Sequence, residues 1–299
     1  MRVTVYCSTA RLGGLDITIP SIAAQTRKPD FFVLADEWWH LRFRNKIEDM
    51  LPFPAIHLFP GWEGFGVSRI ARGHNCAAAH GRDGLLICMN DWMWVPPDWV
   101  ERMAGYAERN PNWTLCGAQY RYDLSDVLEI GVFGSLRGHV PTEGLFSGRQ
   151  PIFKDYRAGQ IRRGAPEGMD ELPPQYWFGG INDSMLAEHW HGVGGADERY
   201  DGAGGGQDID AAFRASRLGA RFAFDSTLIT YEVRGHAHDL AAYHRCPVTN
   251  RPSGVEHVRE FMEDYHRRIE TEGAPLDWRK DVSGIIIPGM NIARREVLA

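Results

Sequence analysis

A run of three glycines, residues 204–206, leads directly to Asp208 and Asp210. Glycine lets a backbone approach a ligand closely, and the first turn of a helix holds unpaired N–H groups. The apolar spacing that follows predicts a helix starting at these aspartates, and Gly219 can close it in a left-handed conformation. The junction can present a carboxylate at the mouth of a pocket. In the alternative interpretation, Gln207 or Asp208 only caps the helix.

Two more carboxylates stand directly after apolar runs. Asp36 follows residues 31–35, and Asp91 follows residues 85–90. Ligands of open parallel sheets bind beyond the carboxyl ends of the strands. Asp36 suits a ribose or base, because a carboxylate accepts hydrogen bonds from hydroxyl and N–H groups. Asp91 suits a divalent cation, which prefers hard oxygen ligands and bridges phosphates. A turn-forming or capping role is the alternative for each.

His236 and His238 are separated by one residue and follow a predicted strand. On an extended segment both rings point to one face, which suits a metal ion or a phosphate group. A plain surface role is the alternative interpretation for this pair.

Composition bounds the class of protein. The chain has 299 residues, 43% of them hydrophobic, which is enough for one large α/β domain or two small ones. The net charge is −6, so the chain has no overall basic field for DNA. Five cysteines without a CxxC pair indicate reduced thiols rather than a zinc site. With neither a signal peptide nor an apolar run of ~20 residues, we expect a cytoplasmic protein without a transmembrane segment.

The hydrophobic patterns predict alternating strands and helices. The strands are expected at residues 3–7, 31–35, 56–59, 85–89, 115–120, 221–224 and 228–232, and the helices at 15–25, 70–79, 96–109, 184–191, 207–218 and 255–269. The strand–helix–strand start implies a parallel sheet with a right-handed crossover.

Residues 123–174 show little periodicity, and we expect them to cover the acceptor of a reaction. They contain a local basic run, which forms either a solvated surface or a phosphate contact. The run consists of Lys154, Arg157, Arg162 and Arg163.

Several stretches, in order, resemble family 2 glycosyltransferases. Residues 3–9 look like the opening strand and loop of the family, residues 21–30 look like its first helix and turn, and residues 36–37 look like its acidic pair. Asn75 and residues 85–99 resemble the region around the DXD motif of the family. The acceptor-side block of the family is resembled by residues 178–180, 193–200 and 206–210. The resemblance covers about residues 1–110 and 175–240. The chain departs from the family in Asn90-Asp91-Trp92, which keeps one DXD carboxylate, in Gln207 for Glu, and in Ala10 and Arg11 for Tyr and Asn.

The resemblance implies an α/β protein with the GT-A (Rossmann-like) fold. Residues 1–245 are expected to form a single domain with a central, mostly parallel sheet flanked by helices. Residues 1–110 form its nucleotide-sugar half and residues 111–245 its acceptor half. Residues 246–299 are expected to form a C-terminal helix and tail that pack on the domain, and the tail is a candidate oligomer contact.

The resemblance also implies a reaction: transfer of a sugar from a nucleotide-sugar, expected to be a UDP-sugar, to an acceptor hydroxyl with inversion. Asp208 is then the general base, and the acceptor is a glycan, a small molecule or a modified nucleic acid. The implied site residues are Thr9, Arg11, Asp36, Asn75, Asn90 and Asp91 for the nucleotide-sugar, Trp177, Gly179, Gly180 and Gln207 for the sugars, and Asp91, His236 and His238 for a divalent metal, Mn²⁺ or Mg²⁺.

Two other functions remain open. A nucleotidyltransferase needs a glycine-rich loop with a basic residue after its first strand, and Arg11, Gly13 and Gly14 lie there. A non-catalytic sugar-binding or scaffold protein with the same fold is favoured by the incomplete DXD motif and disfavoured by Asp208. Nucleotide-sugar hydrolysis that is lost in Asp208→Asn would distinguish an enzyme from a scaffold.

Overall fold

The computed structural model describes residues 1–11, 13–60, 70–128, 134, 142–177, 182–201 and 206–234, and the statements below concern these residues. Gly179, Gly180, His236, His238 and the expected C-terminal helix and tail lie outside them. The boundary between a domain at 1–245 and an extension at 246–299 therefore stays a prediction.

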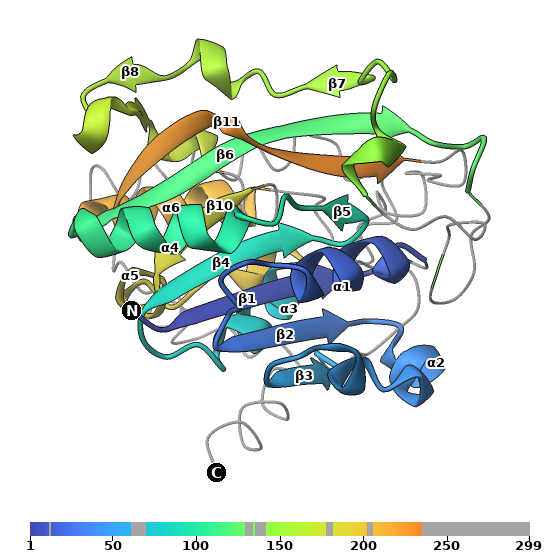
Figure 1. Ribbon diagram of the computed structural model, residues 1–299. Helices are drawn as coiled ribbons and strands as arrows, with labels where there is room; N and C mark the ends of the chain where they lie inside the picture. Colours follow the sequence, from blue (N-terminus) through green and yellow to red (C-terminus); the bar gives the residue numbers. More distant parts are fainter. Residues whose placement is uncertain are drawn as a thin grey trace.

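A five-stranded sheet with the order β10-β4-β1-β2-β3 forms the centre of the fold (Figure 1). Its strands are β1 (Val3–Thr9), β2 (Phe31–Asp36), β3 (Ala55–Leu58), β4 (Leu85–Asn90) and β10 (Asp183–Leu186). The first four are parallel, and β10 runs antiparallel to β4. The predicted mostly parallel sheet is confirmed.

Helices cover both faces of this sheet. Val3, Val5 and Cys7 of β1 pack in one core with α1 (Leu15–Ala23) and α4 (Trp99–Arg109). Tyr6 packs on the other face, where the core includes residues of α3 (Ile70–Ala78), α5 (Ala187–Gly192) and α6 (Gln207–Arg217). Burial on both faces explains why the strands are nearly continuous apolar runs.

A second, six-stranded sheet has the order β7-β6-β11-β9-β8, and β5 also pairs with β11. The strands are β5 (Met93–Trp94), β6 (Trp113–Asp123), β7 (Phe153–Lys154), β8 (Arg162–Arg163), β9 (Asp170–Leu172) and β11 (Arg221–Arg234). Figure 1 shows β6 and β11 running side by side above the first sheet. The prediction of two strands at 221–224 and 228–232 is wrong: β11 is one strand whose register shifts between Asp225 and Ile229.

Short helical segments complete the described chain. They are α2 (Trp39–Arg42) and the 3-10 turns η1 (Phe43–Asn45), η2 (Ile47–Met50), η3 (Glu143–Leu145), η4 (Arg157–Gly159), η5 (Pro166–Gly168), η6 (Pro174–Tyr176) and η7 (Glu198–Tyr200). No helix in the described part of the chain is long and apolar enough to cross a membrane.

The predicted helix at 184–191 is only partly right. Ser184, Met185 and Leu186 belong to β10, in register with Ile87, Leu86 and Leu85 of β4, and helix α5 starts after them. Pairing with the sheet edge outweighs the local helical pattern here, because propensity is a weak prior against tertiary contacts.

Candidate functional site

The carboxyl ends of β1, β2 and β4 bring the predicted polar residues together. Thr9 is in register with Asp36, and Ser8 with Asn90, so Asp91 follows at the same edge. The Thr9 hydroxyl donates a hydrogen bond of 2.5 Å to Oδ2 of Asp91. Asp36 and Asp91, each expected at the carboxyl end of a strand, therefore lie at one edge of the sheet, and Thr9 lies beside them.

Arg11 occupies the other oxygen of Asp91. Its Nε donates to Oδ1 of Asp91 at 2.9 Å, and its Nη2 donates to the same oxygen and, at 3.2 Å, to the Asp91 carbonyl. On its other side, Nη1 of Arg11 lies 3.5 Å from Oε1 of Glu232, which also forms an ion pair with Arg121. The buried carboxylates of Asp91 and Glu232 thus face the guanidinium groups of Arg11 and Arg121.

A divalent metal does not fit this arrangement. Both oxygens of Asp91 accept hydrogen bonds, and its negative charge is already balanced by Arg11. The neighbouring Asn90 offers only a neutral amide. Across the described ranges, no group of three or more His, Cys, Asp or Glu side chains is arranged to hold a metal ion. In this conformation Asp91 is occupied by protein groups, and its assignment as a metal ligand stays a prediction, as do those of His236 and His238.

Asp36 reaches the predicted edge, but the protein encloses its carboxylate. Oδ1 accepts hydrogen bonds from the Trp38 N–H at 2.8 Å and from Arg42 at 3.1 Å, and Oδ2 lies 2.9 Å from Nε2 of His57. The side chains of Asp36 and Arg42 are completely buried. The expected direct contact of Asp36 with a nucleoside does not fit these partners, because Asp36 instead ties β2 to β3 and to α2. Glu37 is the more exposed acid at this point.

Asn75 also binds protein rather than facing a ligand. Its Nδ2 donates to the Ala196 carbonyl at 2.7 Å and to Glu198 at 3.1 Å, and its Oδ1 accepts from the Ala196 N–H at 2.8 Å. These bonds attach α3 to the loop of residues 193–200. The amide of Asn75 thus positions that loop, and its predicted nucleotide contact stays a prediction.

Trp177 is a core residue. It is 1% exposed, packs against Trp190 and Phe222, and donates its indole N–H to the Ser184 carbonyl at 3.1 Å. The prediction that Trp177 contacts a sugar is therefore wrong. Gln207, the first residue of α6, is also buried, at 5% exposure, so its predicted sugar contact requires an opening of the helix start.

Asp208 lies in the first turn of α6, after Gly206 with φ of +94°. It is partly buried, and the Ile209 N–H donates to its Oδ1 at 2.9 Å. Burial raises the pKa of Asp208 to about 6, the backbone N–H groups of the helix start lower it in part, and the charge of Asp183 adds to the rise. The pKa of Asp208 rises on balance, because desolvation is a larger effect than the N–H groups of the helix start.

Arg157 holds Asp183 beside Asp208. Its Nη1 donates to both carboxylate oxygens of Asp183 at 2.8 and 3.0 Å, its Nη2 donates to Asp155 at 2.8 Å, and Nη2 also reaches the Gly117 carbonyl at 2.6 Å. Arg157 is fully buried, whereas Arg162 and Arg163 are exposed. Arg157 is thus neither a solvated residue nor an open phosphate contact, the two roles considered for the basic run.

Asp210 binds a protein group of its own helix. Its Oδ2 accepts from Nη2 of Arg214 at 2.7 Å, and Arg214 in turn donates to the carbonyls of Val193 and Gly195. This completely buried pair fastens α6 to the loop of residues 193–200.

Four site residues were missed by the sequence analysis: Arg42, His57, Asp183 and Glu232. Asp183 had no usable signal, because residues 184–191 have a helical pattern and only pairing with β4 makes Asp183 the first residue of a strand. Arg42 and His57 have no such signal, since their partner Asp36 lies on another element.

Comparisons with known proteins complete the description. No family model and no curated protein matches the chain. Among solved structures, GalNAc-T7 with UDP, GalNAc and Mn²⁺ is similar, with a TM-score of 0.52 at 11% identity over 89% of this chain. TarS 1-349 of S. aureus, alone and with UDP-GlcNAc, gives TM-scores of 0.47 and 0.45 at 11% identity over 78% and 80% of this chain. The chain spans 54% of the GalNAc-T7 chain and 60% of the TarS chain.

At this identity the likeness to GalNAc-T7 concerns the fold alone. It agrees with the mostly parallel central sheet, the helices on both of its faces and the second sheet built on β6 and β11. The chain therefore has the α/β fold of the GT-A glycosyltransferases.

Proposed function

We propose that the protein is a glycosyltransferase that moves a sugar from a nucleotide-sugar, a UDP-sugar in the first instance, to an acceptor hydroxyl with inversion. The observation that carries the proposal is Asp208: a carboxylate with a pKa of about 6 at the start of α6, within the electrostatic influence of Asp183, which on β10 is in register with Cys88 near the carboxyl end of β4. A general base is most effective when its pKa lies near the working pH.

The proposed reaction assigns one proton transfer to Asp208. The acceptor oxygen attacks the anomeric carbon, the bond from that carbon to the diphosphate oxygen breaks, and the acceptor proton passes to the Asp208 carboxylate. Arg157 supports this step indirectly, because it fixes Asp183, whose charge adds to the rise in the pKa of Asp208 that burial mainly causes. The leaving group departs as a nucleoside diphosphate.

The diphosphate needs a positive charge nearby. In related chemistry a divalent metal supplies it as a Lewis acid, but the described residues at the strand ends present a guanidinium, that of Arg11. Its side chain is 19% exposed, whereas that of Asp91 is 5% exposed. We therefore assign to Arg11 the role of a hydrogen-bond donor to the diphosphate at this edge, positioned by Asp91 and Glu232, which already offset its charge.

The proposal is tested by thermal shift with a set of nucleoside diphosphates and nucleotide-sugars, followed by measurement of nucleoside diphosphate release. A ligand that binds only the folded chain raises its Tm. Binding with release, with and without an added glycan, supports a transferase. Binding without release would leave a sugar-nucleotide-binding protein, and absence of any binding would refute the proposal.

The rate of donor cleavage is expected to rise with pH through about 6. Asp208 must be ionised to accept a proton, and its pKa is about 6. Below that pH, log(kcat/KM) should increase by about one per pH unit, and above pH 7 it should level off. Initial rates of UDP release between pH 4.5 and 8.5 give the profile. A profile already flat from pH 4.5 would contradict a base with a raised pKa.

Arg11→Ala is expected to change how the nucleotide binds. In the unchanged protein, UDP should raise the Tm equally with EDTA and with Mn²⁺, because Arg11 already neutralises Asp91. In Arg11→Ala, UDP affinity should fall about 10- to 100-fold, as expected for a lost charge-assisted contact, and Mn²⁺ should restore part of it through the exposed Asp91.

Arg102→Ala is the matched control, since it also removes an Arg–Asp pair but lies on α4. Its UDP affinity should not change. Loss of UDP binding by the unchanged protein in EDTA would show that a metal, not Arg11, supplies the charge.

A further inference from the structure

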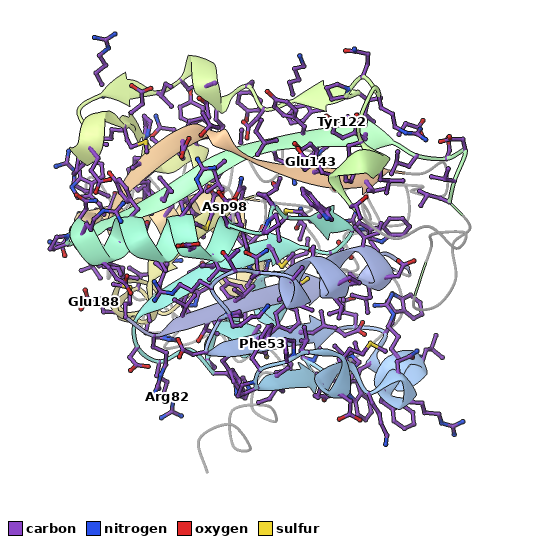
Figure 2. All side chains as sticks on the ribbon, in the orientation of Figure 1. Phe53, Arg82, Asp98, Tyr122, Glu143 and Glu188 are labelled. Carbon is purple, nitrogen blue, oxygen red and sulfur yellow. The ribbon has the colours of Figure 1, made fainter. Side chains whose placement is uncertain are left out.

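A pocket of about 340 Å³ opens where β6 and β11 meet the turn η3. It is lined by Tyr122, Glu143, Gly144, Phe146, Ser147 and Tyr231. Tyr122 comes from β6 and Tyr231 from β11, and the others lie on or next to η3. Figure 2 shows Tyr122 and Glu143 near each other, at the end of the molecule away from Glu188 and Arg82. The pocket therefore includes part of the segment expected to cover an acceptor.

The aromatic wall of the pocket is rigid. Phe146 stacks on Tyr231 with ring centroids 4.8 Å apart, and Tyr122 packs against Phe146 at 5.2 Å. Trp94 of β5 supports Tyr231 from the side at 5.3 Å. Tyr122 and Phe146 are only 6% and 3% exposed, so these rings cannot swing away. A wall that is already ordered costs little entropy when a ligand binds.

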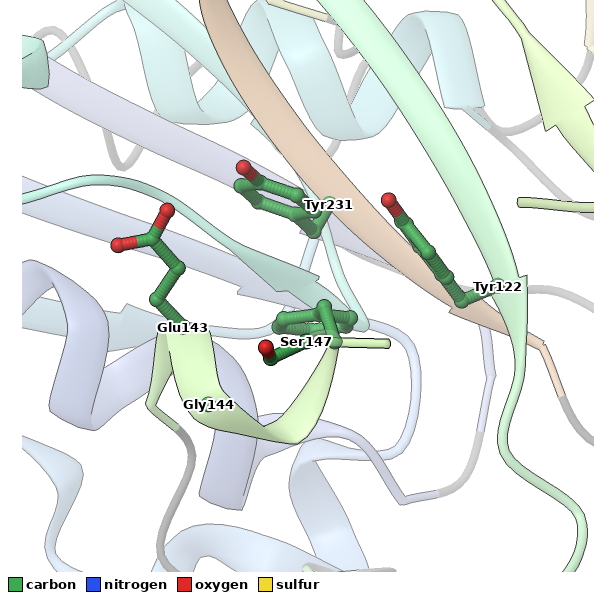
Figure 3. Close-up of a pocket in the computed structure, with 6 residues that line it drawn as sticks. Tyr122, Glu143, Gly144, Ser147 and Tyr231 are labelled. Carbon is green, nitrogen blue, oxygen red and sulfur yellow. The ribbon is translucent and has the colours of Figure 1, made fainter. Parts of the chain in front are cut away.

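Polar groups converge on this wall. Figure 3 shows the hydroxyl of Tyr231 on the side of its ring that faces the Glu143 carboxylate, and the lining residues Tyr122 and Ser147 add two further hydroxyls to the same pocket. Burial, and then the Glu143 carboxylate, raise the pKa of Tyr231, so its hydroxyl stays protonated and can donate. Several hydroxyl donors and one carboxylate acceptor at the edge of an ordered wall are what the hydroxyl rim of a sugar ring requires.

A quaternary ammonium ion suits the pocket less well. An aromatic cage holds such a cation against open ring faces. Here Phe146 and Tyr231 are stacked at an interplanar angle of 22°, so each covers a face of the other. The groups left for a ligand are mainly hydroxyls and a carboxylate at the rim.

The pocket is separate from the proposed reaction centre. Tyr231 precedes Glu232, which contacts Arg11, and neighbouring residues of a strand point to opposite faces. Along β6, Gly117 accepts a hydrogen bond from Arg157 next to Asp183, while Tyr122 lines the pocket. At about 3.3 Å per residue, the stretch between them spans ~16 Å. One sugar ring cannot reach both places.

We propose that this pocket binds one sugar unit of an extended glycan acceptor, some units away from the hydroxyl that reacts at Asp208. The inference rests on the proposed sugar transfer and names its acceptor class: an oligosaccharide or polysaccharide rather than a small molecule. Binding energy from such a remote unit helps to hold the reacting hydroxyl in place.

Saturation-transfer NMR with the methyl glycosides of glucose, galactose and N-acetylglucosamine tests the pocket directly, and choline and uridine serve as competing probes. At least one glycoside should bind to the unchanged protein. Tyr231→Ala should weaken that binding about 10-fold or more, as for the loss of an aromatic contact and a hydrogen bond. Phe43→Ala, an exposed aromatic residue outside the pocket, is the control and should have no effect.

Variants of the exposed Glu143 keep the test meaningful if Tyr231→Ala unfolds. Glu143→Ala should weaken glycoside binding about 5- to 10-fold, whereas Glu143→Gln, which still accepts hydrogen bonds, should stay within about 3-fold. The assignment would be overturned if no glycoside bound or if uridine alone bound. It would also be overturned if choline bound and this binding were lost in Glu143→Gln. The glycoside experiment contains no nucleotide, so it tests the pocket independently of the reaction. If the protein bound a glycoside but neither bound nor cleaved any nucleotide-sugar, the proposed function would be refuted and the sugar pocket would remain supported.

Discussion

Asp208→Asn is expected to slow donor cleavage and sugar transfer about 100- to 10,000-fold while making the folded protein more stable. The loss of rate follows from removal of the general base. The gain in stability follows from burial, which raises the pKa of Asp208 to about 6 and so disfavours its ionised form in the folded state. At neutral pH, removing this charge should stabilise the fold by about 1 to 3 kcal/mol, a Tm rise of a few degrees.

The pH dependence of that gain has a definite sign. A carboxyl whose pKa is raised by folding binds more protons in the folded state, so ionisation costs stability as the pH rises from about 4 through 6. The difference in Tm between Asp208→Asn and the unchanged protein should therefore be absent near pH 3.5 and reach its full size above pH 6.5. Thermal unfolding across this range measures it.

Asp98→Asn is the matched control. Asp98 also stands at the start of a helix, α4, but its side chain is 50% exposed. It should leave both the rate and the stability nearly unchanged. If Asp208→Asn kept transfer within about 3-fold of the unchanged protein, Asp208 would not be the base, whatever its effect on stability.

Arg157→Met is expected to destabilise the fold by about 3 to 5 kcal/mol. The substitution keeps much of the side-chain volume but leaves Asp155 and Asp183 buried without their shared cation. Removing one partner of a buried ion pair costs far more than the pair contributes, because the remaining charge stays desolvated. Urea unfolding at pH 7 gives the free energy of unfolding of both proteins.

Arg149→Met removes a pair of similar geometry at the surface, with Asp126, whose side chain is 59% exposed. Exposed ion pairs contribute about 0 to 1 kcal/mol, so this control should unfold almost like the unchanged protein. Equal stability of the two variants would show that Arg157 is not the buried link described above. In folded Arg157→Met, Asp183 without its guanidinium partner should also move the pH profile of donor cleavage upward.

Much of the fold and part of the site could be predicted from residues near one another in the chain. The apolar runs of β1, β2 and β4 mark buried parallel strands, because such strands are covered on both faces. Parallel strands end at one edge, so Thr9, Asp36 and Asp91 had to meet there. The helix after Asp208 and its left-handed closure at Gly219, with φ of +98°, follow from local spacing and from the conformational freedom of glycine.

The remaining features depended on contacts between distant elements. Ser184 to Leu186 became a strand because β4 offered an open edge. Trp177 and Asn75 turned out to be structural because their partners are fixed only when the chain is folded.

The electrostatic environment of the site carboxylates also depended on contacts between distant elements. The sequence by itself determined which carboxylates reach the edge of the sheet, since strand ends are set by local pattern. Only the tertiary structure decided that Arg42 and His57 enclose Asp36, that Arg11 neutralises Asp91 and that Asp208 keeps a raised pKa. The physical reason is that desolvation and ion pairing depend on which groups surround a side chain in space, and no spacing along the chain encodes that directly.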